Sequence, residues 1–391
     1  MSHRSIISFL THDRPPAASS PGGGDGGAGG AGGDGGAASL AQALDARVRE
    51  GELVERVPES EGMGSGVVRC FACGHRCLVK PGRRGICKVR FNRDGTLYAP
   101  AGYVAALQCD PTEKKPFFHA LPGSDTLTFG MLGCDFHCGY CQNWLTSQAL
   151  RDDTAGVLPT DVTPDDLVRL ALRHGAKLVG SSYNEPLITA EWAVEVFKAA
   201  RAQGLKTAFI SNGNATPEVL DYIRPWTDCY KIDFKAMDDK RYRELGGVLQ
   251  HVLDAIRMVY ERGFWLELVT LIVPGFNDDD GQLTRAAEYI ASVSPEIPWH
   301  VTAFHKDYKM TDPDNTTPET LVRACEIGAG AGLKFVYAGN LPGRVGRWEH
   351  TYCPDCGDLL IERYGYVIKQ QRIGPGGRCP SCNRRIPGIW S

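Results

Sequence analysis

The sequence predicts an α/β protein with a mostly parallel sheet and a small cysteine-rich module at each end of the chain. Between residue 126 and about residue 340, short runs rich in β-branched residues alternate with amphipathic helical stretches, which is typical of strand–helix–strand units. The chain contains 14 cysteines, and all but Cys109, Cys229 and Cys325 fall into three tight groups. With 391 residues, 42% of them hydrophobic, it can bury a sizeable core.

The charge and hydropathy pattern excludes several classes of protein. The 43 basic and 46 acidic residues leave a formal net charge of -3, whereas a nucleic-acid binder held by bulk electrostatics is clearly basic. No apolar run approaches the ~18–20 residues of a membrane helix, and Ile6–Leu10 is too short for a secretory signal. We therefore expect a cytoplasmic protein whose clustered cysteines bind metals rather than form disulfides.

The N-terminal part of the chain divides into a tail and a module. We expect residues 1–60 to form a disordered tail and a short helix, because Pro21–Ala38 is almost entirely Gly, Ala and Asp. Helical spacing of apolar residues follows over Leu40–Val57. We assign residues 61–125 to a cysteine-rich module and a connecting arm.

The repetitive central region spans residues 126–345. Its expected strands are Thr126–Met131, Lys177–Ser181, Thr207–Ser211, Cys229–Asp233, Trp265–Ile272, His300–Ala303 and Lys334–Tyr337. Its expected helices lie near 164–174, 189–203, 216–223, 238–260, 280–292 and 317–330. Because six or seven such units fall short of an eight-stranded barrel, an open partial barrel and a doubly wound sheet both fit the pattern.

Three cysteines follow the first of these strands within one short loop: Cys134, Cys138 and Cys141. The odd number is informative, because a structural zinc site closes itself with four ligands. Three cysteines on a cubane iron–sulfur cluster leave one iron free to bind an outside molecule. A zinc knuckle that borrows a further ligand, such as His137, is the alternative.

The CxxxCxxC spacing of this loop resembles the radical S-adenosylmethionine (SAM) superfamily, with the aromatic Tyr140 before the last cysteine. The resemblance implies an open, partial parallel β/α barrel that carries a [4Fe–4S] cluster and SAM. It also implies an oxidoreductase-type activity. The reduced cluster would cleave SAM to a 5′-deoxyadenosyl radical, which abstracts a hydrogen atom from a substrate that the sequence does not identify.

Polar residues follow the next two strands, at the edge where the carboxyl ends of parallel strands meet. The second strand runs into Tyr183, Asn184 and Glu185, and the third ends in Ser211 and Asn212. By resemblance to the activating enzymes of this superfamily, these residues would bind SAM, with Glu185 paired to its ammonium group. An ordinary loop acid and a turn signal are the alternatives.

The remaining site candidates carry charges or imidazoles. Period two places Lys231, Asp233 and Lys235 on one strand face, and we assign Asp233 and Lys235 to the substrate cavity. A structural ion pair is the alternative. His300 and His305 bracket a later strand and are candidates for proton handling or substrate binding, although a lone histidine is more often structural.

Several elements together are similar to a narrower family, the radical SAM enzymes of the AmmeMemoRadiSam system, which is related to pyruvate formate-lyase activating enzymes. The elements are Gly85–Arg90, Glu113–Pro116, Cys141–Trp144, Tyr183–Pro186, Pro298–His300 and Phe304–His305. Asp135, Ser181, Ser182 and Lys306 depart from the family pattern.

The family implies an electron donor of the flavodoxin or ferredoxin type and an association with AMMECR- and Memo-type proteins. A true glycyl-radical activase is the alternative enzyme. From another class, a zinc-binding scaffold protein would also explain the outer cysteines.

The two outer cysteine groups have different spacings. Residues 346–391 carry two CxxC knuckles on a hairpin-like stretch (Leu359–Glu362 and Tyr366–Gln370), a zinc-ribbon pattern for which a rubredoxin-like iron is the alternative. The knuckles are Cys353, Cys356, Cys379 and Cys382. The N-terminal group, which suits zinc, a second iron–sulfur cluster or free thiols, comprises Cys70, Cys73, Cys77 and Cys87.

Overall fold

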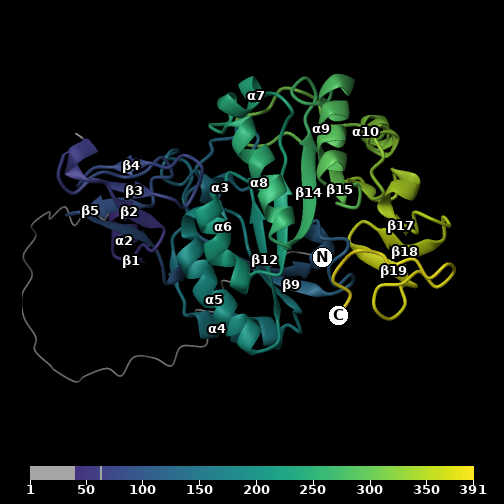
Figure 1. The fold of residues 1–391 in the computed structure, drawn as a ribbon, viewed down its shortest axis with the longest axis horizontal. Coiled ribbons are helices and arrows are strands. Elements are labelled where there is room, and N and C mark those ends of the chain that lie inside the picture. Colours follow the sequence, from purple (N-terminus) through teal and green to yellow (C-terminus); the bar gives the residue numbers. More distant parts are fainter. Residues whose placement is uncertain (1–39, 62–63) are drawn as a thin grey trace, which may run out of the picture.

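A computed structural model describes residues 40–61 and 64–391 of the chain. The Gly-rich tail that we expected to be disordered lies outside these residues. Figure 1 shows a central sheet with its helices, an N-terminal module on one side and a C-terminal module on the other.

The central sheet has eight strands in the order β16-β15-β14-β13-β12-β11-β9-β8. All neighbours from β9 to β16 are parallel, whereas β8 pairs antiparallel with β9 at one edge. The strands are β8 (Ala106–Pro111), β9 (Asp125–Gly130), β11 (Leu178–Ser181), β12 (Lys206–Ser211), β13 (Cys229–Asp233), β14 (Trp265–Ile272), β15 (Trp299–Ala303) and β16 (Val336–Gly339). The predicted parallel α/β sheet is confirmed.

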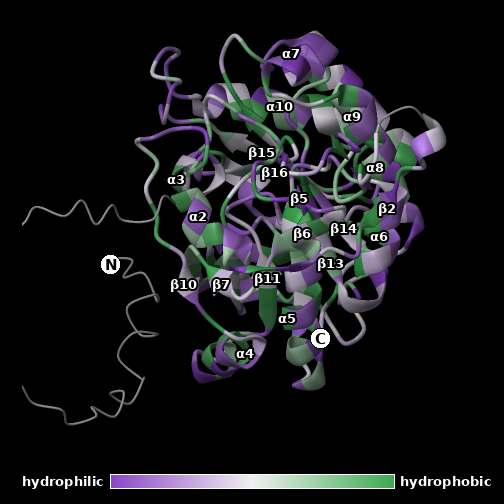
Figure 2. Ribbon diagram, turned by 90° about the vertical axis from the view of Figure 1, so that its left-hand side faces the viewer, coloured by the Kyte–Doolittle hydropathy of each residue, from purple (hydrophilic) through white to green (hydrophobic). Residues whose placement is uncertain are grey.

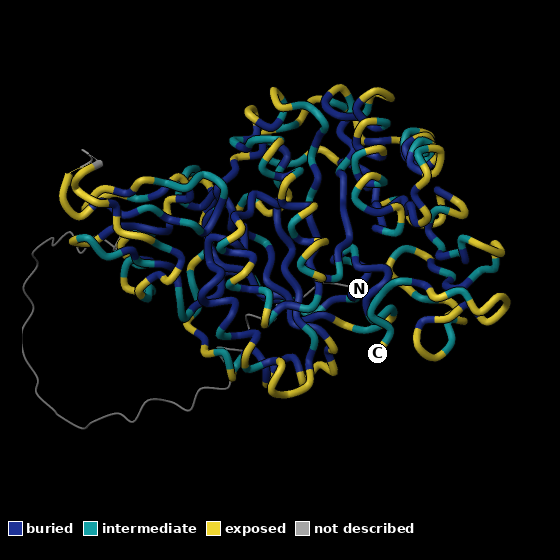
Figure 3. The backbone as a smooth tube through the Cα atoms, in the orientation of Figure 1, coloured by how far each residue is buried: buried dark blue, intermediate teal, exposed yellow. Residues whose placement is uncertain are grey.

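The strand order decides between the two architectures that the periodicity left open. A doubly wound sheet reverses its strand order at a switch point, and this sheet does not reverse. Its crossover helices are α4 (Pro164–Arg173), α5 (Ala190–Ala202), α6 (Pro217–Ile223), α7 (Asp239–Glu244), α8 (Leu249–Glu261), α9 (Asp280–Val293) and α10 (Pro318–Gly330). The sheet therefore curls as an open partial barrel, whose strands are almost entirely buried (Figure 3).

Local sequence explains where the helices begin and on which side they pack. Helix α4 begins at a capping box in which Thr163 and Asp166 bond each other's backbone, with Pro164 at the first helical position. Its Leu167, Val168, Leu170 and Ala171 face the core. Figure 2 shows the same division of hydropathy, with hydrophobic residues along inner strands such as β11 and a largely hydrophilic α7.

The helix expected over 238–260 is in fact two helices, α7 and α8, and this correction bears on the site. Gly246 has φ +86 at the break, and a Cβ on Gly247 would lie 2.4 Å from Cζ of Phe136. Glycine permits both the backbone turn and the close approach of that ring. The backbone N–H of His137 donates to the Leu245 carbonyl at 2.9 Å, so the break supports the cysteine loop.

The N-terminal module begins earlier in the chain than we expected. The helical pattern over Leu40–Val57 is wrong beyond Asp45: only α2 (Leu40–Asp45) is helical, followed by β1 (Val48–Glu50) and β2 (Val54–Arg56). Strand β1 pairs with β6 (Thr96–Pro100), which also pairs with β5 (Phe91–Arg93), in one small antiparallel sheet. Strand β2 pairs with β3 (Val68–Cys70), which also pairs with β4 (Leu78–Val79), in a second one. Long-range pairing of β-branched residues has overridden the helical spacing.

Two short strands and one short helix complete the region around the barrel. Strand β7 (Tyr103–Val104) pairs with β10 (Thr160–Asp161), and α3 (Trp144–Ser147) follows the cysteine loop. Among the described residues, no helix has the length and apolar character needed to cross a membrane.

The C-terminal module is a three-stranded antiparallel sheet of β17 (Thr351–Tyr352), β18 (Leu359–Tyr364) and β19 (Val367–Gln371), and its hairpin confirms the predicted one. Leu360 and Ile361 pack against Phe118, which follows β8, and against Tyr337 of β16. The module therefore spans both edges of the open sheet. Ile389 exchanges backbone hydrogen bonds of 2.7 Å with the segment around Leu121.

Candidate active site

A cavity of about 360 Å³ lies where the central strands end. Most of its lining residues lie at the ends of β9, β11, β12 and β13 or in the loops after them, and residues of β14, β15 and the segment after β8 also contribute. In a parallel barrel this end collects the loops that differ from enzyme to enzyme, and ligands bind there.

The three cysteines of the loop after β9 all line this cavity. Gly133 precedes them with φ +93, and a Cβ there would lie 2.7 Å from Cγ1 of Val89. The backbone N–H of Phe136 donates to Sγ of Cys134 at 3.3 Å, and Sγ of Cys141 lies 3.2 Å from Oγ of Ser147. A tight, glycine-dependent turn therefore presents the three sulfurs to the cavity.

The donor set fits an iron–sulfur cluster better than a single metal ion. In residues 40–61 and 64–391, a set of three or more Cys, His, Asp or Glu ligand atoms within 4.8 Å of one another occurs only in the C-terminal module. The cavity sulfurs are therefore spread too widely for one ion. His137, the fourth ligand of the zinc alternative, is exposed and packs against Gly246 instead.

Burial also affects the protonation of the three thiols. Burial raises the pKa of Cys138 to about 12 and raises the pKa values of Cys134 and Cys141. Such thiols keep their protons at neutral pH unless a metal displaces them.

A buried carboxylate faces the same cavity from the loop after β11. Glu185 accepts hydrogen bonds from Oγ of Ser211 (2.7 Å), from the backbone N–H of Asn212 (2.8 Å) and from that of Leu187 (3.1 Å). Burial, and then the negative charge of Asp135, raise the pKa of Glu185 to about 8 against these hydrogen bonds. A cationic ligand group beside Glu185 would restore its ionised form.

Asp135 and Asn214 form a polar contact that the sequence did not reveal. The amides of Asn212 and Asn214 donate to the two oxygens of Asp135, at 2.7 and 2.8 Å. The side chain of Asn212 therefore supports the cysteine loop, while its backbone supports Glu185. In the sequence, only the Asn-Gly-Asn motif at residues 212–214 pointed to a role for Asn214.

The other predicted cofactor residues also line the cavity. Asn184 accepts a hydrogen bond from the Met131 backbone at 3.0 Å, which fixes the loop after β11. Tyr183 has a left-handed backbone (φ 67), and Nζ of Lys115 lies 3.0 Å from its hydroxyl oxygen. Tyr140 packs edge-to-face on Phe276. Lys115 was not among the predicted site residues.

The charged residues of β13 lie on the cavity and pair with one another. Asp233 forms an ion pair with Lys231, and Nζ of Lys235 lies 3.7 Å from its Oδ2. All three residues line the cavity. Burial alone would raise the pKa of Asp233, but the two lysines hold it below its ordinary value. Asp233 and Lys235 therefore line the cavity, as we expected, and also form the ion pair that was the alternative.

His300 and His305 do not line the cavity, contrary to our expectation. His300 is buried below it, with Nε2 2.7 Å from Oε2 of Glu267, and burial lowers its pKa. His305 is exposed, with Nε2 2.9 Å from Nε2 of Gln142. Strand periodicity predicts the direction of a side chain, whereas the depth along the barrel axis depends on the stagger between strands.

Comparisons with known proteins agree with this site. A family model described as the radical SAM superfamily matches residues 129–287, which contain the cysteine loop and the strands beside it. The uncharacterized protein MJ0808 of Methanocaldococcus jannaschii is 35% identical over 342 residues, which cover 87% of this chain and 99% of that protein. The chain belongs to the radical SAM superfamily.

This radical SAM enzyme is related to the activating enzymes of pyruvate formate-lyase. Pyruvate formate-lyase 1-activating enzyme of Escherichia coli is 27% identical over 238 residues, which cover 55% of this chain and 93% of that enzyme. A crystal structure of a domain of pyruvate-formate lyase-activating enzyme from Bacteroides vulgatus is 25% identical, covers 41% of this chain and 98% of that chain, and has a TM-score of 0.37.

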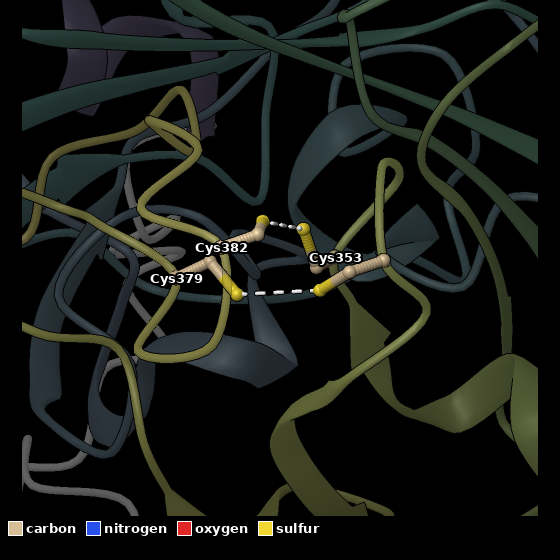
Figure 4. A group of neighbouring side chains, drawn as sticks. Cys353, Cys379 and Cys382 are labelled. Carbon is tan, nitrogen blue, oxygen red and sulfur yellow. Dashed lines mark hydrogen bonds between the residues drawn. The ribbon is translucent and has the colours of Figure 1, made fainter.

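The four cysteines of the C-terminal module form a second type of site in this radical SAM enzyme. Sγ of Cys353 lies 3.5 Å from that of Cys382, and Sγ of Cys356 lies 3.6 Å from that of Cys379 (Figure 4). A tetrahedral ion with bonds of about 2.3 Å holds its sulfurs about 3.8 Å apart. The C-terminal group therefore has the dimensions of a site for one metal ion.

Proposed function

We propose that this radical SAM enzyme belongs to an AmmeMemoRadiSam system and that Cys134, Cys138 and Cys141 ligate its [4Fe–4S] cluster. The single observation that carries the proposal is the convergence of these three sulfurs and the buried Glu185 on one cavity. The three cysteines would hold the cluster beside the cavity, and the cluster would supply the electron for the reductive cleavage of SAM that generates a hydrogen-abstracting radical.

The residues of the chain have separate roles in this proposal. Glu185 binds the ammonium group of SAM, because neutral hydrogen-bond donors only partly offset the free-energy cost of burying its negative charge. Ser211 and Asn212 hold that carboxylate in place. Tyr140, Tyr183 and Asn184 form the walls of the SAM pocket.

Asp233 and Lys235 position the substrate in the same cavity. Both residues line the cavity, and their charged groups pair there. Lys115 lies on another part of the wall and is held by Asp110 at 3.0 Å. Paired lysines favour a substrate with hydrogen-bond acceptors over an apolar one.

The similarity to MJ0808 extends beyond the part of the chain that matches the E. coli activating enzyme. The match to MJ0808 covers 87% of the chain, whereas the match to the E. coli activating enzyme covers 55%. The motifs of the AmmeMemoRadiSam enzymes, including Gly85–Arg90 and the C-terminal knuckles, extend beyond the central region. As partners we propose a flavodoxin- or ferredoxin-type donor and AMMECR- or Memo-type proteins, in the cytoplasm.

The C-terminal module binds zinc in this proposal. The contact distances of 3.5 and 3.6 Å between its sulfurs support one tetrahedral ion. The alternative is a rubredoxin-like iron. Metal analysis of a variant without the cavity cysteines, combined with its visible spectrum, separates the two ions.

The proposed activity is tested without oxygen. Reconstituted protein, reduced with dithionite and given SAM, should release 5′-deoxyadenosine, and the Cys138→Ala variant should release none. A protein with an intact cluster that leaves SAM uncleaved would contradict the enzymatic proposal. A colourless protein that holds only zinc would instead support the scaffold alternative.

A glycyl-radical activase remains the second candidate enzyme, because of the similarity to the E. coli activating enzyme. Electron paramagnetic resonance (EPR) of candidate partner proteins after incubation with the reduced enzyme and SAM distinguishes the two. A stable glycyl radical on a partner would replace the AmmeMemoRadiSam assignment. The AmmeMemoRadiSam assignment would be supported if no glycyl radical forms and if metabolites associated with AMMECR- or Memo-type proteins stimulate SAM cleavage by the enzyme.

A further inference from the structure

We propose that Cys70, Cys73, Cys77 and Cys87 ligate a second iron–sulfur cluster, separate from the active-site centre. Two segments of the N-terminal module bring these cysteines together. The β3–β4 hairpin carries the first three, and the backbone N–H of Cys70 donates to the Cys77 carbonyl at 3.0 Å. The turn that contains Cys87 folds onto this hairpin, where the backbone N–H of Ile86 donates to Sγ of Cys77 at 3.5 Å.

The spacing of the sulfurs argues against a single zinc ion. Three sulfurs of a mononuclear site lie within 4.8 Å of one another in the C-terminal module, and no three of the N-terminal cysteines do. No three ligand atoms of the active-site cysteine loop do so either. A cluster of four irons is several ångströms across, so its thiolates stand further apart than those of one ion.

Free thiols, the remaining alternative, leave one N–H of a buried cation without a hydrogen-bond partner. Arg90 is 1% exposed, and its Nη atoms bond Glu191 and the Ile188 carbonyl. Within the described residues its Nε–H has no hydrogen-bond partner. An anionic thiolate-ligated cluster beside Arg90 would give this N–H an electrostatic partner.

The proposed cluster would lie beside the active-site loop. The carbonyl oxygen of Cys87 is 3.1 Å from the position of a Cβ on Gly133. Arg151 connects the same two segments, with Nη2 donating to the Ile86 carbonyl (2.6 Å) and Nη1 to the Phe136 carbonyl (3.0 Å).

The test counts metals in the full-length protein purified and reconstituted without oxygen. The wild type should hold about eight iron atoms per chain, and the variant Cys134→Ala/Cys138→Ala/Cys141→Ala should keep about four. Dithionite should give this variant the EPR signal of a reduced cluster, and SAM should not change that signal. Adding Cys73→Ser and Cys87→Ser should remove the iron, whereas adding Cys325→Ser, a buried and isolated cysteine, should not.

The opposite results overturn the proposal independently of SAM cleavage. A wild type with about four iron atoms, or a folded triple variant with zinc or no metal in the N-terminal module, excludes the second cluster. Circular dichroism and the C-terminal metal report whether the triple variant is folded. If it is not, the wild-type iron count alone decides.

Discussion

Arg90 and Glu191 form a fully buried, two-pronged ion pair between the N-terminal module and α5. Nη1 of Arg90 lies 2.8 Å from Oε2 of Glu191, Nη2 lies 2.7 Å from Oε1, and the two residues are 1% and 0% exposed. Glu191 also accepts from the backbone N–H of Glu52 at 3.2 Å. This pair holds the proposed second cluster site against the barrel.

Replacing Glu191 should therefore detach the N-terminal module. Glu191→Gln leaves the Arg90 charge buried with a weaker partner, and we expect a loss of about 3–5 kcal/mol in the free energy of unfolding. The control is Glu195→Gln on the same helix, whose pair with Arg49 is partly exposed and should contribute less than about 1 kcal/mol. Urea unfolding measures both, and equal effects would contradict the role of the buried pair.

The same pair predicts how stability changes with pH. Burial raises the pKa of Glu191, but the Arg90 charge and hydrogen bond outweigh it and hold the pKa below its ordinary value. The stabilisation is thus complete above the unfolded pKa of about 4.3 and is lost as the pH falls through the lower folded value. Acid unfolding of the wild type should show this loss, whereas Glu191→Gln should show a smaller pH dependence over the same range.

Glu185→Gln should weaken SAM binding while the iron content stays the same. The variant keeps one carbonyl oxygen, which replaces one of the two oxygens that Ser211 and Asn212 bond, and it removes the charge that faces the cavity. A lost charge-assisted hydrogen bond of about 1.5–3 kcal/mol corresponds to roughly 10- to 150-fold weaker binding. Anaerobic calorimetry measures the affinity, with Glu244→Gln on the exposed α7 as control. Unchanged affinity would remove Glu185 from the SAM site.

Gly247→Ala should disturb the cysteine loop through Phe136. The new Cβ would lie 2.4 Å from Cζ of that ring, so the ring or the backbone has to shift. We expect a destabilisation of about 1–3 kcal/mol and a lower iron content after reconstitution. Gly330→Ala is the matched control, because a Cβ there meets nothing within 4 Å. A normal iron content in Gly247→Ala would show that Phe136 does not support the loop.

Removal of the C-terminal metal should loosen the C-terminal module from the two edges of the open barrel. Arg363 of β18 bonds the Phe118 carbonyl at 2.9 Å, and Leu360 and Ile361 pack against Tyr337 of β16, so the module bridges the two sheet edges. Cys379→Ser should abolish metal binding there and speed limited proteolysis after β16, with the active-site iron retained. Cys325→Ser serves as control. A Cys379→Ser protein as protease-resistant as the wild type would show that the metal does not hold the module.

Much of the fold was predictable because its signals are local. β13 and β14 have the bounds that the sequence predicted, since buried parallel strands read as short apolar β-branched runs. The break between α7 and α8 was missed because it depends on Phe136, which is more than 100 residues away in the chain. Strand β8 was missed because an edge strand has a weaker apolar pattern.

The sequence by itself determined the chemistry: the ligand atoms of Cys134, Cys138 and Cys141 follow from residue type and spacing within one loop. Only the tertiary structure decided which charges meet. It joined Arg90 to Glu191, paired Asp135 with Asn214, and buried His300 against Glu267 below the cavity. Spacing along a loop is set by covalent geometry, whereas contacts between distant segments depend on how strands and helices pack, which one sequence pattern does not encode.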